Sequence, residues 1–94
     1  MLELVTTFRP ADRSPAKTIT LRISDVRPDA DGATWSVAVE VLGFKYEDRV
    51  RLKQVDWTNA IGDAARFIAR RVRDEVEAAG GGTLDPPIDF PKED

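Results

Sequence analysis

Residues 57–79 constrain the fold most, because their pattern is that of one long amphipathic helix. At 100° per residue, apolar side chains gather within about 60° of Ile61. They are Trp57, Ala64, Ala65, Ile68, Val72, Val76 and Ala79. Asp56 is suited to cap the first turn, and Gly80 is suited to end the helix. Such a helix is stable only when its apolar face is covered, so the rest of the chain is expected to cover it.

Four segments before the helix alternate apolar and polar residues, as strands with one buried face do. They are residues 2–8, 18–24, 34–42 and 46–54. The short connections between them favour an antiparallel meander. We therefore predict an α+β fold: a two-layer sandwich in which a four-stranded antiparallel sheet is covered on one face by a C-terminal helix, in the order β-β-β-β-α.

The chain after the helix has a different composition. Three consecutive glycines at 80–82 are followed by Pro86, Pro87 and Pro91, which disfavours helix or central strand. We predict one domain over residues 1–79 and a disordered, flexible acidic tail over residues 80–94. The tail carries three spaced apolar residues, Leu84, Ile88 and Phe90. Two interpretations stay open: an unselected terminus, or anchors for a partner groove or for the domain's own basic surface.

Composition argues against catalysis. The chain has no cysteine and no histidine, which removes thiolate chemistry, the commonest general base and the commonest metal ligand. The sequence shows no glycine-rich phosphate loop, and residues 29–32 are typical of a hairpin turn and not of a calcium loop. We predict a non-enzymatic protein without cofactor or metal. No segment approaches the roughly 18 apolar residues of a membrane span, so a cytoplasmic protein without membrane contact is expected.

Two basic groups are candidates for nucleic-acid binding. Arg66, Arg70 and Arg73 form a basic stripe on the exposed helix face, and a second group (Arg49, Arg51 and Lys53) lies on the outer face of the predicted sheet. Acidic residues four positions along the helix can pair with Arg70 and Arg73. The two groups point in opposite directions and lack an aromatic ladder, so nucleic acid is the less favoured partner.

Three aromatic residues border the predicted core. Trp35 and Trp57 are in phase with the apolar faces and are predicted to pack inside. Phe67 lies at the boundary of the apolar helix face. It can either complete the core or anchor a partner, and the sequence leaves both open.

The junction of the last strand and the helix reads Gln54-Val55-Asp56-Trp57-Thr58-Asn59-Ala60-Ile61, and the strand at 34–42 comes before it. This stretch resembles a family of small uncharacterised bacterial domains. In that family, antiparallel strands lead through a Val-Asp motif into one alanine-rich helix. The resemblance covers residues 16–79 and implies a fold but no activity.

These observations favour a protein-interaction or adaptor module, with self-association into a homodimer as one form of it. An edge strand or the Phe67 flank would form the interface, and the tail would add a second contact. Two alternatives remain: a nucleic-acid-associated protein using a basic face, and a small immunity-type inhibitor of a toxin. The second alternative rests only on the small size and the net charge of −3.

Overall fold

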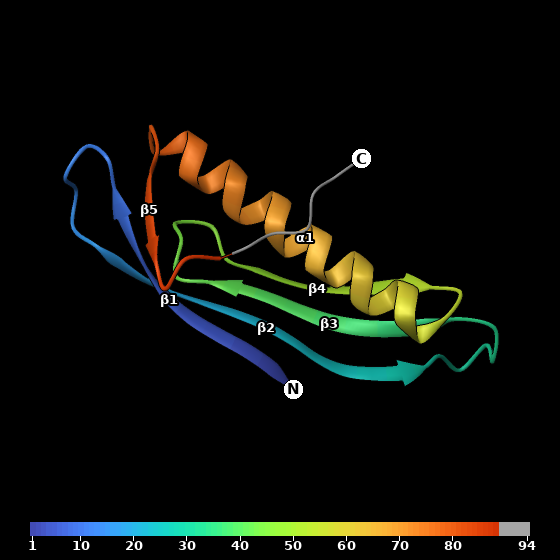
Figure 1. Ribbon diagram of the computed structural model, residues 1–94. Helices are drawn as coiled ribbons and strands as arrows, with labels where there is room; N and C mark the ends of the chain where they lie inside the picture. The colour runs from blue at the N-terminus through green and yellow to red at the C-terminus, as the bar shows by residue number, and fades with distance from the viewer. Residues whose placement is uncertain (89–94) are drawn as a thin grey trace.

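The computed structural model describes residues 1–88 as one antiparallel sheet with a single helix across one face (Figure 1). The elements are β1 (Leu2–Pro10), β2 (Lys17–Pro28), β3 (Trp35–Leu42), β4 (Asp48–Gln54), α1 (Trp57–Ala78) and β5 (Gly82–Asp85). The strand order is β4-β3-β2-β1-β5. The predicted α+β class and antiparallel meander are confirmed, but the sheet has five strands where the sequence predicts four.

The first four strands follow the alternation of the sequence. The register pairs Leu4 with Leu21, Leu21 with Val41, and Val39 with Val50, so apolar residues line up across the sheet. β2 runs four residues past the predicted end at Ser24. A bulge there places Asp25 at φ 53°, and pairing resumes at Arg27 with Ser36.

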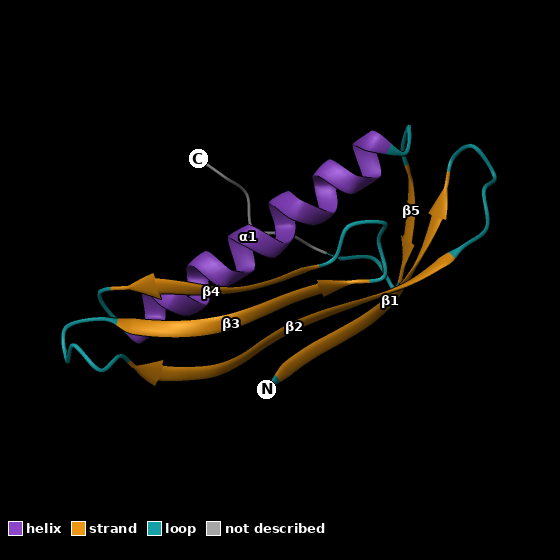
Figure 2. Cartoon of the chain, turned by 180° about the vertical axis from the view of Figure 1, so that it is seen from behind, coloured by secondary structure: helices purple, strands orange, loops and turns teal. Residues whose placement is uncertain are grey.

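The core lies between the sheet and α1. Its helix residues are mostly small, which lets the helix approach the strands closely. The buried helix positions are Ala60, Ala64, Ile68, Ala69 and Val72. The buried sheet positions include Phe8, Ile19, Leu21, Val37, Val39 and Val41. Seen from behind, the other face of the sheet carries no helix in residues 1–88 (Figure 2).

Both predicted ends of α1 are confirmed. The side chain of Asp56 accepts a hydrogen bond from the backbone N–H of Asn59, with 2.8 Å between the two atoms. At the other end, the N–H of Gly80 donates to the carbonyl of Glu77, and the N–H of Gly81 donates to that of Val76. Gly80 has a φ of +82°, so these bonds form a Schellman motif.

The two tryptophans differ in how far they are buried. Trp35 is half-buried and packs against the core, as predicted. The prediction for Trp57 is wrong, because its side chain is 53% exposed. Trp57 occupies the first turn of α1, directly after the turn that leaves edge strand β4, and the covered part of the helix begins at Ala60.

The largest correction concerns residues 80–88. The predicted flexible tail begins instead with β5, which pairs with β1 from Thr7–Asp85 to Pro10–Gly82. Gly80, Gly81 and Gly82 all adopt positive φ values and turn the chain back toward β1. The packed unit therefore extends past the predicted boundary at residue 79. The prediction for residues 89–94 lies outside the described residues.

Candidate functional site

The side of β1 that faces away from β2 is only partly paired. β5 covers it from Thr7 to Pro10, and among residues 1–88 no strand pairs with the preceding stretch. The pairing stops at Thr7–Asp85, and the carbonyl of Pro86 then accepts a hydrogen bond from the side chain of Thr6, which lies on the face that carries α1. The chain after β5 therefore leaves the edge, and proline has no N–H with which to extend the ladder. We call the remaining stretch, Leu2 to Val5 on this side, the open edge. Along it, the backbone N–H and C=O groups of alternate residues point outward without a strand partner, while those of the other residues point toward β2.

Apolar side chains surround the open edge on both faces of the sheet. Leu2 is 63% exposed, Leu4 is 37% exposed and Val5 is 50% exposed. Leu2 and Leu4 share a face with the buried side chain of Phe8, which is the face that carries α1. The helix packs mainly on β3, with further contacts to β2 and β4, and leaves these two leucines uncovered.

The opposite edge of the sheet, β4, is different. Its outward side chains are the charged Arg49, Arg51 and Lys53, all exposed. Charged side chains on an edge strand oppose pairing with another chain. The open edge of β1 has one charged residue, Glu3, whose carboxylate lies 3.5 Å from the guanidinium of Arg22. Within residues 1–88, the open edge of β1 is therefore better suited to strand addition than the β4 edge.

The outer face of the sheet carries a network of opposite charges. Arg22 contacts Glu3 and Glu40, and Arg49 donates to Glu40 across 3.1 Å. Arg51 donates to the carboxylate of Asp25 and to the hydroxyl of Ser36. Because carboxylates already contact these guanidinium groups, the face is a poor match for phosphate.

The basic stripe of α1 lies on the other side of the molecule. Arg66, Arg70 and Arg73 are all exposed, and Arg66 pairs with Asp63 three positions before it. Hydrogen bonds from Arg66 and from Gln54 lower the pKa of Asp63, so this carboxylate stays charged beside the stripe. The helix separates the stripe from the outer sheet face, so the two basic groups form no common surface (Figure 1).

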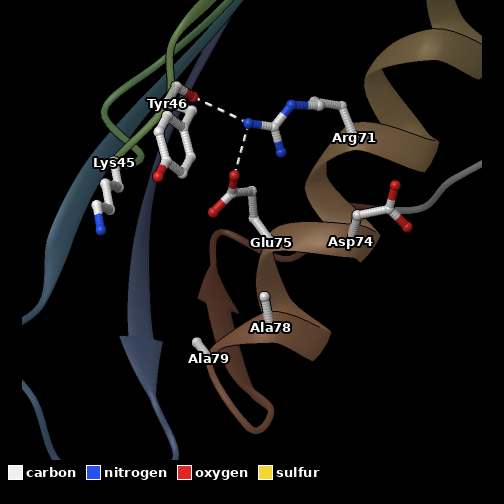
Figure 3. A pocket seen from close by; sticks show the side chains of 7 residues that line it. All are labelled: Lys45, Tyr46, Arg71, Asp74, Glu75, Ala78 and Ala79. Atoms are coloured by element: carbon white, nitrogen blue, oxygen red, sulfur yellow. Dashed lines mark hydrogen bonds and ion pairs between the residues drawn. The ribbon is translucent and has the colours of Figure 1, made fainter.

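A shallow hollow of about 410 Å³ lies between the C-terminal half of α1 and the β3–β4 loop (Figure 3). It is lined by Lys45, Tyr46, Arg71, Asp74, Glu75, Ala78 and Ala79. The Arg71 guanidinium donates to the carbonyl of Tyr46 and to the carboxylate of Asp48, and it pairs with Glu75. Burial alone would lower the pKa of Arg71, but the bonds to Glu75 and Asp48 raise it. This guanidinium fastens the helix to the loop and has its main partners within the protein.

Comparison of the chain with protein-family models, with curated proteins and with solved structures found no match. The resemblance of residues 54–61 to small bacterial domains therefore stays a prediction. Within residues 1–88, no helix has the length and apolar character needed to cross a bilayer. The same residues contain no cluster of three or more acidic groups placed to hold a metal ion.

The structure places the predicted partner-binding residues as follows. Phe67 is half-buried and packs against the core. Leu84 lies opposite Phe8 in the β1–β5 pair, and both Leu84 and Ile88 also pack against the core. Phe90 lies outside the described residues. Leu84 and Ile88 thus have a structural role, and their partner binding stays a prediction.

The alternation of residues 2–8 predicts a strand. It does not predict that one part of this strand stays unpaired as the open edge. Leu2, Leu4 and Phe8 share one side of that strand, which predicts a common buried face. Phe8 is buried and Leu2 is exposed. This difference follows from the strand order and from the packing of α1 on β2, β3 and β4, across which the helix runs diagonally (Figure 1). Residue pattern alone carries no signal for either property.

Proposed function

We propose that this protein is a non-enzymatic interaction module that binds a partner protein by strand addition to the open edge of β1. One observation carries the proposal. From Leu2 to Val5 the strand has an unpaired side, and exposed apolar side chains lie on both of its faces. An extended polypeptide satisfies such an edge with backbone hydrogen bonds and covers the flanking side chains.

The surroundings of the open edge support a polypeptide over other ligands. The edge offers alternating donors and acceptors at strand spacing, which another strand matches group for group. The neighbouring charges, Glu3 and Arg22, already contact each other. The three apolar side chains give a partner area to bury, and about 25 cal/mol per Å² is gained as that area leaves water.

Site-specific photocrosslinking in the source cells tests this function. A photoreactive phenylalanine analogue would replace Val5 in one version and Val55 in a control version. Val55 is a fair control because it is 69% exposed and follows the opposite edge strand. We expect protein adducts from position 5 that disappear when Leu2→Lys and Leu4→Lys are added, and only background from position 55. Equal adducts from both positions, or none from position 5, would reject strand addition.

A further inference from the structure

We infer that the partner at the open edge is a second copy of this chain, joined to the first by antiparallel pairing of the two β1 strands. This inference rests on the proposed function and names its partner. An edge strand is complementary to itself under a two-fold axis, because antiparallel pairing exchanges the same donors and acceptors in both directions. Two copies would thereby satisfy both open edges at once and leave no new edge beside them.

The structure restricts the register of this pairing. The open edge is closed at one end by β5, since Thr7 already pairs with Asp85. Centring the axis on Val5 would place Glu3 opposite Thr7 of the second copy, where that copy's β5 blocks the edge. Centring it on Glu3 would set two carboxylates directly opposite each other, which is unfavourable. Centring it on Leu4 avoids both problems and pairs Glu3 with Val5 of the second copy.

The same register covers the exposed leucines. With Leu4 facing Leu4, Leu2 comes opposite Thr6 of the second copy. Thr6 is bonded to Pro86, and Ile88 packs against the core two residues further on. The most exposed of the three side chains of the open edge would thus lie beside apolar atoms of residues 86–88. Both helices would lie on one side of a continuous sheet, because a two-fold axis perpendicular to the sheet keeps its faces matched.

The size of the contact sets the expected affinity. A short strand pair with a few apolar side chains falls at the small end of specific interfaces, and such contacts are reversible. We expect a monomer–dimer equilibrium with a dissociation constant on the order of 1–100 µM. Sedimentation velocity of the full chain over that concentration range should show the weight-average mass rising toward twice the monomer mass.

Cysteine crosslinking tests the register, since the natural chain has no cysteine. Leu4→Cys should form a symmetric disulfide under mild oxidation, because opposite residues in an antiparallel pair are close enough for one. Glu3→Cys mixed with Val5→Cys should crosslink about tenfold faster than either does alone, because only the mixture places the two sulfurs opposite each other. Val55→Cys, exposed to a similar degree as Leu2, is the control and should crosslink slowly.

The outcomes test the identity of the partner separately from the proposed strand addition. Concentration-dependent dimers together with the Leu4 and Glu3–Val5 crosslinks would establish the second copy. A chain that stays monomeric up to 1 mM would overturn the inference, and so would crosslinks no faster than those of Val55→Cys. If the photoadducts from position 5 then contained a different protein, strand addition would stand with that protein as the partner. If there were also no photoadducts, the proposed function would fail as well.

Discussion

The hydroxyl of Thr6 donates a hydrogen bond to the carbonyl oxygen of Pro86, and 2.7 Å separates the two oxygen atoms. The side chain of Thr6 is only 1% exposed, and the two residues lie 80 positions apart in the chain. The bond comes directly after the last β1–β5 pair, Thr7 with Asp85. It therefore holds the segment after β5 against β1 at the place where the open edge begins.

Thr6→Val should destabilise the protein, because it keeps the shape of the side chain and removes the donor. The carbonyl of Pro86 would then be left partly buried without this partner. We expect the free energy of unfolding in urea to fall by about 1–2 kcal/mol. Thr20→Val is the matched control on the outer face of β2, and its change should stay within about 0.5 kcal/mol. Equal losses for both variants would contradict a specific role for the Thr6–Pro86 bond.

Gly82→Ala should detach β5 from β1. Gly82 has a φ of +153°, and a Cβ atom there would lie 2.5 Å from the Phe8 ring and 2.5 Å from the carbonyl oxygen of Arg9. We expect the amides of Thr83 and Leu84 to exchange at least about tenfold faster with solvent, measured by hydrogen exchange.

Gly80→Ala is the control for the backbone strain alone. Gly80 also has a positive φ, +82°, but nothing lies within 4 Å of its added Cβ. This variant should lose about 1–2 kcal/mol through the left-handed conformation and keep β5 paired. Loss of β5 protection in both variants would mean that the turn, and not the contact with Phe8, holds the strand.

Arg71→Met should weaken the attachment of α1 to the β3–β4 loop. The guanidinium bonds to Asp48 in β4 and to the Tyr46 carbonyl, and its side chain is only 19% exposed. We expect a loss of about 1–3 kcal/mol in urea unfolding, as for hydrogen bonds to charged groups. Arg71→Lys should recover little, because an ammonium group cannot reproduce the planar fork. Arg49→Met removes an exposed pair and should cost less than about 1 kcal/mol.

Most of the fold was predictable because the helix and the longer strands each show a periodic spacing of apolar residues in the sequence. The helix was expected at 57–79 and is found at Trp57–Ala78, with Asp56 and Gly80 in the roles that their side chains allow. The four longer strands follow from alternation for the same reason. A local pattern of this kind places the apolar side chains on one face of a helix or strand, whichever element then covers that face.

β5 and the open edge could not be predicted in the same way. β5 has four residues, begins with a glycine and contains one half-buried side chain, Leu84, so it shows no alternation. Its partner is the far end of β1, more than seventy positions earlier. Which part of β1 stays open depends on where this distant pairing stops. That property belongs to the tertiary structure, and local sequence patterns do not report it.

Asp56 gives a prediction for acid stability. Hydrogen bonds from the Thr58 hydroxyl and then from the Asn59 backbone lower the pKa of this carboxyl below its ordinary 3.8. A carboxylate whose pKa is lower in the folded state stabilises the fold above the unfolded pKa, and the effect fades as the pH falls through the folded value. Asp56→Asn can still cap the helix but does not titrate. The stability difference between wild type and Asp56→Asn should therefore be constant above about pH 5 and should shrink below pH 3.8.

The measurement is urea unfolding of both proteins between pH 2.5 and 7. The two free energies of unfolding are subtracted at each pH, so that the contributions of the other carboxylates cancel in the difference. The effect should be modest, because the site is open to solvent and the charge is well screened. Asp56→Ala, which lacks a capping side chain, should be less stable than both at neutral pH and should approach wild type in acid. A wild-type minus Asp56→Asn difference that stays level down to pH 2.5 would show that the cap acts through its geometry and not through its charge.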